Sequence, residues 1–423
     1  MSASALPPKT HNLSALSDEL VKMGQKYYVP AYKPREMILD HGKGSTIWDL
    51  DGNDYIDLAA GIAVSALGHQ DPDLLAALDA QSRKLWHTSN VFFTEPPIRL
   101  AELLVESVPF ARKVFFTNSG AEANEAAIKL ARKYATSQGR EPKRRDIITF
   151  AGSFHGRTLA TVTATAQAKY QEGYEPLPGG FRYCPSFNDE AAIEAMVDEN
   201  TCAILVEPVQ GEGGVMPAKK GYLQYLRKLA DKVGALLILD EIQCGMGRTG
   251  TLFAHTQDEV VPDIVTLAKA LAGGLPIGAM LAGEKVADIF QFGSHGSTFG
   301  GNPVMCAVAH AAVTKITTPA VLANVEARAN QLRAALADIN GELSIFKEIR
   351  GRGLMIGAEL QSPFAGNANA LADVARKYGV LILVAGPNVL RFVPPLTITE
   401  KELGEGLKRL KAGLSEHKAS HKE

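Results

Sequence analysis

The sequence predicts an α/β fold built on a mainly parallel sheet. From about residue 110, short apolar segments alternate with helical patterns, which is typical of βαβ units. These segments are apolar on both faces, as the strands of a sheet covered on both sides are. Glycine-rich loops follow several of them, and open parallel sheets bind ligands at the carboxyl ends of their strands. The strand candidates are 114–117, 147–150, 203–208, 235–240, 263–268 and 278–283.

The segments on either side of this region predict a hairpin, three helices and a smaller mixed unit. Asp51-Gly52 is a hairpin-turn signal, and two of the helical patterns open with proline. We expect the tail 415–423 to be frayed. The expected ranges are 47–58 for the hairpin, 72–85, 96–108 and 319–339 for the helices, and about 353–360 and 389–393 for the later strands.

Composition excludes several classes of function. The formal net charge of −2 gives no electrostatic reason to expect nucleic acid or an anionic membrane as a partner. We find no apolar run near the roughly 18 residues that a membrane span needs, and no secretory signal at the N-terminus. Four cysteines without a CxxC pair favour a reduced, cytoplasmic protein and no metal site. They are Cys184, Cys202, Cys244 and Cys306.

The segment "GMGRTG", residues 245–250, has the G-x-G-x-x-G form of a dinucleotide fingerprint. That fingerprint must follow a strand directly and open a helix. Here "EIQC" intervenes after the strand, and the residues that follow make a poor helix. We therefore interpret it as a glycine-rich loop of the functional site rather than as a nucleotide site.

Three features at strand ends point together to one cofactor. Ser119 suits the N-cap of a helix, with Glu122 completing a capping box, and Gly120 lets a phosphate approach the helix N-terminus. Asp240 ends an apolar strand, and Lys269 stands in the apolar run "TLAKALAGGLP". Taken singly, each feature has an ordinary explanation. The helix start at Ser119 fits normal capping, Asp240 fits a helix cap, and Lys269 fits a lysine whose side chain snorkels to the surface.

Together these features are what pyridoxal phosphate requires. The lysine forms a Schiff base with the cofactor, and the aspartate keeps the pyridine nitrogen protonated, so that the ring acts as an electron sink. Desolvation lowers the pKa of such a lysine and makes its amine nucleophilic. This chemistry explains why an ammonium group stands in an apolar strand end.

At this point the sequence resembles the class III (ornithine-type) aminotransferases, from about residue 30 to residue 415. The resemblance implies fold type I, with an N-terminal segment 1–60 that joins a small domain, a large domain 61–317 and a C-terminal small domain 318–423. It also implies a homodimer with active sites at the subunit interface. The blocks that carry it are "NSGAEANEAAIKLAR" (118–132), "FHGRTLATVT" (154–163), "VEPVQGEGG" (206–214), "LILDEIQCGMGRTG" (237–250), "TLAKALAGGLPIGA" (266–279) and "STFGGNP" (297–303).

The resemblance implies a role for each matching cofactor residue. Lys269 joins the cofactor and then moves the proton. Asp240 pairs with the pyridine nitrogen, and Gln243 bonds the phenolic oxygen. The phosphate is held by the backbone of Gly120 and Ala121, with Ser119 beside them, and by Thr298 of the other subunit. Phe154 stacks on the ring, and no metal is implied.

The resemblance also implies how two carboxylate-bearing substrates are held. Arg157 and Arg391 match positions that grip carboxylates, and Ser297 faces the substrate. Glu207 matches a residue that pairs with Arg391 until the carboxylate of 2-oxoglutarate displaces it. We interpret His155 and His69 as hydrogen-bonded structural residues, because Lys269 already fills the role of base.

Two blocks, 85–104 and 386–399, most resemble the branch of the family that acts on N2-acylated ornithines. The implied donor is N2-acetyl-L-ornithine, the acceptor is 2-oxoglutarate, and glutamate is a product. N2-succinylornithine is the alternative donor within this branch. Ornithine or 4-aminobutyrate as donor, and an aminomutase or decarboxylase on the same fold, stay open. A non-catalytic binding protein is the remaining alternative, and it predicts no need for Lys269.

Overall fold

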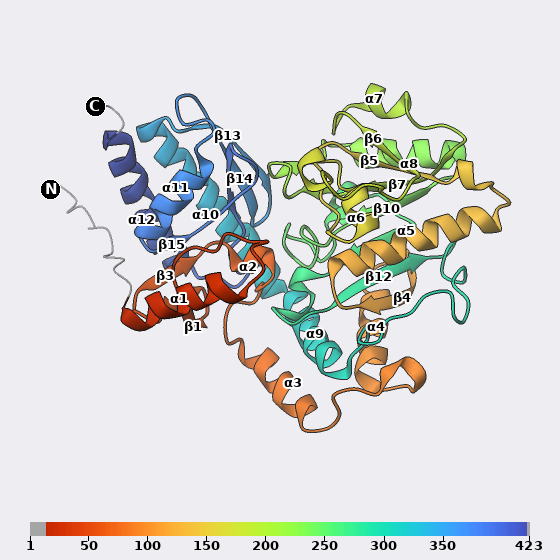
Figure 1. The fold of residues 1–423 in the computed structure, drawn as a ribbon, viewed down its shortest axis with the longest axis horizontal. Coiled ribbons are helices and arrows are strands. Elements are labelled where there is room, and N and C mark those ends of the chain that lie inside the picture. The colour runs from red at the N-terminus through yellow and green to blue at the C-terminus, as the bar shows by residue number, and fades with distance from the viewer. Residues whose placement is uncertain (1–13, 421–423) are drawn as a thin grey trace.

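The computed structural model describes residues 14–420, and its chain forms two units that stand side by side in Figure 1. The larger unit is built on a seven-stranded sheet in the order β4-β12-β11-β10-β7-β5-β6. All neighbouring strands are parallel except the two pairs that β12 makes. The predicted mainly parallel sheet is thus confirmed. Its strands are β4 (Ala111–Thr117), β5 (Asp146–Phe150), β6 (Phe181–Cys184), β7 (Thr201–Val206), β10 (Leu236–Asp240), β11 (Ile264–Leu267) and β12 (Gly278–Gly283).

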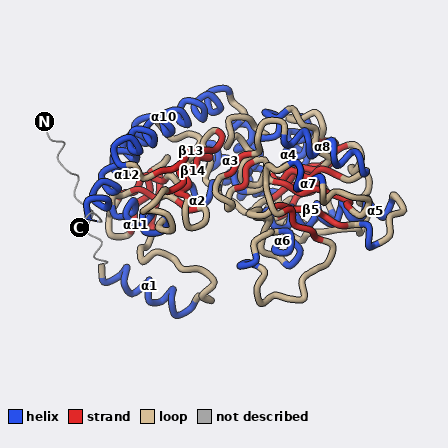
Figure 2. Tube along the Cα trace, turned by 90° about the horizontal axis from the view of Figure 1, so that it is seen from above, coloured by secondary structure: helices blue, strands red, loops and turns tan. Residues whose placement is uncertain are grey.

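Every residue of β7, β10, β11 and β12 is buried, as their apolarity on both faces predicted. Helices lie on both sides of the strands in Figure 2. The six predicted strands are all present, whereas β6 was missed because "FRYC" is short and half polar. The helices of this unit are α3 (Pro72–Ser82), α4 (Glu95–Glu106), α5 (Gly120–Ser137), α6 (Leu159–Ala164), α7 (Glu190–Glu194), α8 (Tyr222–Val233) and α9 (Pro303–Ile316).

The smaller unit combines the two ends of the chain, drawn red and blue in Figure 1. One of its sheets has the order β1-β2-β3-β15, in which β15 pairs in parallel with β3. The other sheet has the order β13-β14-β17-β16. The domain boundaries expected at residues 60 and 317 stay a prediction. The strands are β1 (Leu39–Lys43), β2 (Thr46–Asp49), β3 (Asp54–Asp57), β13 (Phe346–Arg352), β14 (Met355–Leu360), β15 (Val380–Leu381), β16 (Leu383–Val384) and β17 (Val389–Phe392).

The predicted hairpin is β2 and β3, which pair antiparallel around a turn where Gly52 has a φ of +81°. The expected frayed tail is wrong as far as residue 420, because α12 runs through it. Its buried leucines recur at helical spacing, which anchors the helix on the core. Residues 421–423 lie outside the described residues. The helices are α1 (Ala15–Tyr27), α2 (Ala60–Ala63), α10 (Pro319–Leu343), α11 (Ala368–Lys377) and α12 (Glu400–Ser420).

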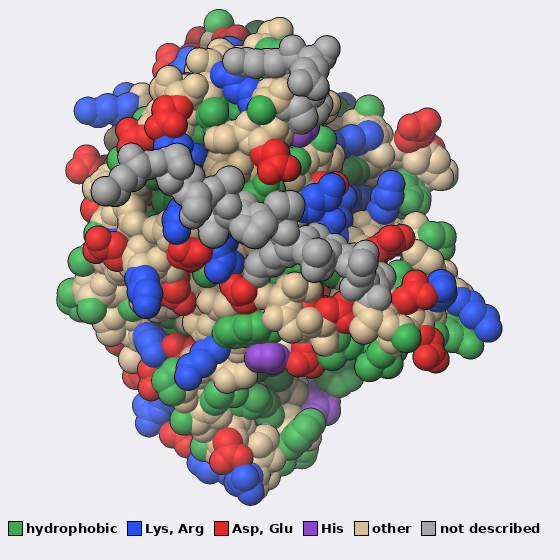
Figure 3. Space-filling view, turned by 90° about the vertical axis from the view of Figure 1, so that its left-hand side faces the viewer, with side chains coloured by type: hydrophobic (Ala, Val, Ile, Leu, Met, Phe, Trp, Pro, Cys, Tyr) green, Lys and Arg blue, Asp and Glu red, His purple; other side chains and the backbone are tan. Residues whose placement is uncertain are grey.

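Between residues 14 and 420, no single helix is long and apolar enough to cross a membrane. Only α9 and α10 taken together pass that test of length and composition, and they meet at an angle of 66°. On the face drawn in Figure 3, acidic and basic side chains are interspersed, in keeping with the formal net charge of −2.

Candidate active site

A cavity of about 400 Å³ opens at the carboxyl ends of the large sheet's strands. This volume lies within the range of small-molecule pockets. Most of the predicted site residues line it, although they come from five separate segments of the chain. The predicted residues in its lining are Ser119, Gly120, Ala121, Phe154, Arg157, Glu207, Asp240, Gln243 and Lys269.

Lys269 directly follows β11 and begins a 3₁₀ turn, η5 (Lys269–Ala272). Its φ of +37° is unusual for a residue with a side chain and marks local strain. Burial lowers the pKa of Lys269, and the nearby carboxyls of Asp240, Glu212 and Glu207 act in the opposite direction. Within residues 14–420 its amine has no hydrogen bond or ion pair, so it is available as a nucleophile.

Asp240 ends β10 and is held by three donors. Its Oδ2 accepts hydrogen bonds from Asn124 Nδ2 and His155 Nδ1, both at 2.8 Å. Its Oδ1 accepts from the Ile242 N–H at 3.0 Å. Asn124 is fixed in turn, because Thr266 Oγ1 donates to its Oδ1 at 2.8 Å. The carboxylate is therefore oriented before any ligand arrives.

Asn124 and Ile242 were missed from the sequence, although Asn124 lies one helical turn after Gly120 in α5 and Ile242 lies between two predicted residues. The prediction that His155 and His69 are hydrogen-bonded structural residues agrees with their contacts. His155 bonds Asp240, and His69 Nε2 lies 2.9 Å from Asp57 Oδ2.

The N-terminus of α5 faces the pocket. Ser119 Oγ accepts from the Glu122 N–H at 3.2 Å, as predicted. The other half of the capping box is wrong, because Glu122 Oε2 accepts from the Asn118 N–H at 2.8 Å and not from that of Ser119. At Gly120 an added Cβ would lie 2.8 Å from Ile242 Cδ1, so only glycine lets these segments meet. Free N–H groups and the helix dipole at this end suit a phosphate.

Arg391 of β17 is only 3% exposed, and it lies behind Gln243 rather than in the cavity lining. Its Nη1 donates to Gln243 Oε1 at 3.1 Å and to Glu212 Oε1 at 2.6 Å. The first bond fixes the amide of Gln243 and uses its oxygen as acceptor, so its NH₂ group stays available as a donor. An added Cβ at Gly211 would lie 2.5 Å from that nitrogen.

The predicted pair of Glu207 with Arg391 is wrong, because Arg391 pairs with Glu212. Glu207 is 6% exposed, and its Oε2 has no hydrogen-bond partner among the described residues. Burial, and then the neighbouring Asp240, raise the pKa of Glu207 well above its usual value, which favours its neutral form. Glu212 stands in the glycine-rich loop between β8 (Val209–Gln210) and β9 (Met216–Pro217), where it can reach the arginine.

Ser297 and Thr298 do not line the cavity of this chain. Ser297 Oγ accepts from Asn118 Nδ2 at 3.0 Å and from the Gly300 N–H at 2.9 Å. Thr298 is exposed. Their predicted roles involve a partner subunit and stay predictions.

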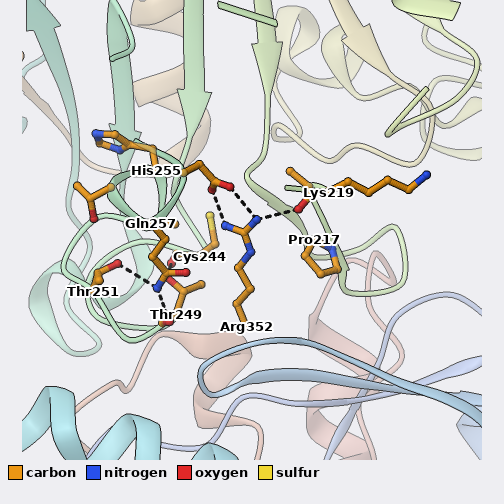
Figure 4. A network of polar contacts seen from close by, with 12 residues as sticks. Pro217, Lys219, Cys244, Thr249, Thr251, His255, Gln257 and Arg352 are labelled. Atoms are coloured by element: carbon orange, nitrogen blue, oxygen red, sulfur yellow. Dashed lines mark hydrogen bonds and ion pairs between the residues drawn. The ribbon is translucent and has the colours of Figure 1, made fainter. Parts of the chain in front are cut away.

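The loop that follows Asp240 is fixed from two sides. The Glu241 carboxylate accepts from the Ala254 N–H at 2.6 Å and from His255 Nδ1 at 2.7 Å. Figure 4 shows the second side, where Arg352 of β13 reaches across from the small unit. Its guanidinium donates to Asp258 at 2.5 and 3.1 Å. The small unit thus holds the loop that carries the pocket residues.

The segment "GMGRTG" is followed only by the short 3₁₀ helix η4 (Ala254–Asp258), so it does not open a helix as a dinucleotide fingerprint must, in agreement with the sequence-based interpretation. Cys244 is buried, and burial raises its thiol pKa well above the usual value. It is therefore not a reactive thiolate.

Comparisons with known proteins agree on one family. The model of the class-III aminotransferases matches residues 27–414. The acetylornithine aminotransferase of Xanthomonas axonopodis is 62% identical over 93% of this chain and 96% of its own length. The succinylornithine transaminase of Yersinia pseudotuberculosis is 50% identical over 92% and 95%. The crystal structure of N-acetylornithine aminotransferase from Stenotrophomonas maltophilia superposes with a TM-score of 0.84 at 53% identity, over 95% of this chain and 100% of that one.

Glu207→Gln is expected to change how the stability of the ligand-free protein depends on pH. The raised pKa means that the folded protein keeps a proton which the unfolded chain releases above its ordinary pKa of 4.5. Wild type therefore loses stability relative to the variant as the pH rises above 4.5. Thermal unfolding midpoints of both proteins between pH 4.5 and 9 measure this difference.

Glu359→Gln is the control of opposite sign. Hydrogen bonds from Lys347 and Arg350 lower the pKa of Glu359. Wild type should be the more stable protein above pH 4.5 and lose that advantage as the pH falls. A Glu207→Gln protein that behaved like this control would show that Glu207 is charged in the folded state.

Proposed function

The chain belongs to the class-III aminotransferases, and from that premise we propose that it transfers the distal amino group of N2-acetyl-L-ornithine to 2-oxoglutarate. The products are N-acetyl-L-glutamate 5-semialdehyde and L-glutamate, in arginine biosynthesis. The 62% identity to an acetylornithine aminotransferase, against 50% to a succinylornithine transaminase, is the observation that carries this choice of donor.

The family depends on pyridoxal phosphate, which when bound supplies an electron sink for the substrate's electrons. The residues of this chain fit that group. The unpaired amine of Lys269 and the pre-oriented carboxylate of Asp240 line one cavity with the N-terminus of α5. Lys269 would bond the cofactor, Asp240 its ring nitrogen, and the backbone of Gly120 and Ala121 its phosphate. Phe154 would stack on the ring.

In the proposed reaction, Lys269 moves the proton. Its Nζ would take the proton from the amine-bearing carbon of the donor and would deliver it to the bound cofactor. Burial lowers the pKa of Lys269, which favours the neutral amine that can act as a base. Two half-reactions follow one another at one site, so the kinetics are ping-pong.

Arg391 and Glu212 solve the problem of binding two unlike substrates. When the donor presents its distal amine, Glu212 neutralises Arg391 across 2.6 Å. When 2-oxoglutarate enters, its α-carboxylate displaces Glu212 and takes the arginine. Arg157 grips the other carboxylate, since its guanidinium lines the cavity.

The proposal includes a homodimer whose partner subunit supplies Thr298, with Ser297 facing the substrate. A surface rich in exposed aromatic side chains supports the homodimer. Hydrogen bonds join the segment around residues 86–93 with the segment around residues 297–302 into this one surface. Asn302 Nδ2 donates to the Trp86 backbone oxygen at 2.8 Å, and Asn90 Nδ2 donates to the Gly300 backbone oxygen at 2.9 Å. The exposed aromatic side chains of this surface are Trp86, Phe92, Phe93 and Phe299.

The proposal also includes a cytoplasmic location. It is supported by the four cysteines, which are all free and buried.

Glu212→Ala is expected to affect the two half-reactions unequally. Without Glu212 the buried Arg391 stays unpaired when the donor binds, and leaving a buried charge unpaired should lower kcat/KM for N2-acetylornithine roughly 100-fold. The value for 2-oxoglutarate should change far less, because this substrate brings its own carboxylate. Stopped-flow absorbance of each half-reaction measures both values, and equal losses would contradict the switch.

The donor is tested by the ratio of kcat/KM values with 2-oxoglutarate as acceptor. We expect N2-acetylornithine to exceed N2-succinylornithine and 4-aminobutyrate by roughly tenfold or more, the range that differences in pocket contacts provide. A preference for N2-succinylornithine would reassign the donor and keep the reaction class. Turnover of none of these donors would point to another reaction on the same fold.

A further inference from the structure

We propose that Tyr170 is a positioning residue that holds the guanidinium of Arg157 at the pocket and so sets the affinity for a substrate carboxylate. The inference rests on the proposed function, in which Arg157 binds that carboxylate. The side chain of Arg157 is exposed at the cavity. Among the residues that the structure describes, none makes a hydrogen bond or ion pair with it, so something else must hold it in place.

Two aromatic rings surround the guanidinium. Arg157 Cζ lies 4.0 Å from the centre of the Tyr170 ring and 5.5 Å from that of Phe154. The two rings meet edge to face, with centres 5.8 Å apart and planes at 85°. A guanidinium this close to a ring face is attracted by the ring's quadrupole. Stacking uses the face of the guanidinium and leaves its N–H edge free for a carboxylate.

The segment that carries Tyr170 is bonded to the segment that carries Phe154 and Arg157. Thr165 Oγ1 accepts from the His155 N–H at 2.9 Å. Gln167 Nε2 donates to the Ser153 backbone oxygen at 2.9 Å. The segments that carry the ring and the guanidinium are therefore held together by side-chain-to-backbone hydrogen bonds as well as by the cation–π contact.

Gln171, the neighbour of Tyr170, fixes this segment further. Its Nε2 donates to the backbone oxygens of Thr163 at 3.1 Å and Thr165 at 2.9 Å, at the end of α6. Tyr170 itself donates its backbone N–H to the Gln167 oxygen at 3.0 Å. Tyr170 thus stands on a fixed segment, next to a guanidinium that makes no hydrogen bond or ion pair among residues 14–420.

The experiment compares Tyr170→Leu, which removes the ring, with Tyr170→Phe, which keeps it, in the cofactor-loaded protein. We expect Tyr170→Leu to raise KM for 2-oxoglutarate roughly three- to tenfold with little change in kcat. Tyr170→Phe should keep the wild-type KM. Tyr174→Leu is the matched control, because Tyr174 lies in the same loop and is 61% exposed.

Three results would overturn the inference. One is an unchanged KM in Tyr170→Leu while Arg157→Ala raises it. Another is a KM that rises equally in Tyr170→Phe, which would assign the effect to the hydroxyl. The third is a fall in kcat and thermal midpoint with KM unchanged, which would make Tyr170 merely structural. If Tyr170→Leu does not fold, Tyr170→Met takes its place in the comparison.

Failure of the proposed function looks different. If Arg157→Ala itself leaves KM for 2-oxoglutarate unchanged, Arg157 does not bind a carboxylate. That result removes the premise as well as the inference, whereas the three results above leave the premise intact.

Discussion

The free-energy cost of an amine at the end of a buried strand shapes the whole site. Lys269 follows β11, in a sheet whose central strands are wholly buried, and its positive φ shows that the backbone bends to place it. Burial lowers its pKa while the carboxyls around it oppose that change. Burial disfavours the charged form of this amine, and a covalent bond to a ligand removes that cost. The oriented carboxylate of Asp240, the open N-terminus of α5 and the buried Glu207, whose pKa is raised, all fit a ligand that bonds to this amine.

The two units of the chain contribute different parts of this site. The large sheet carries Lys269, Asp240 and the helix N-terminus, whereas Arg391 comes from β17 of the small unit. Arg391 joins the two, since it orients Gln243 and pairs with Glu212. Arg352 makes a second connection at Asp258. Arg391 therefore keeps its position relative to the pocket residues of the large unit through polar contacts that cross the boundary between the units.

The sequence was sufficient for the architecture and for most of the pocket. Apolar strand ends followed by glycine-rich loops located the site, and the family match confirms the predicted fold type I. Sequence reasoning failed where the outcome depends on which of two nearby side chains reaches a partner. Glu207 and Glu212 are five residues apart, and only the turn between β8 and β9 shows that Glu212 reaches Arg391. Likewise, the Glu122 carboxylate accepts from the N–H of Asn118 rather than from that of Ser119. Tyr170 lies outside every motif block, and only the fold brings it to Arg157.

The most direct measurement is chemical trapping of the cofactor. The protein is loaded with pyridoxal phosphate, reduced with borohydride, digested and analysed by peptide mass spectrometry, with and without prior addition of N2-acetylornithine. We expect the phosphopyridoxyl group on Lys269 in the first sample. We expect it to be largely lost from that residue in the second, because the donor releases the lysine. A label on another lysine, or none at all, would contradict the role assigned to Lys269. If the amount of label on Lys269 stayed the same after addition of N2-acetylornithine, that result would contradict the proposed donor.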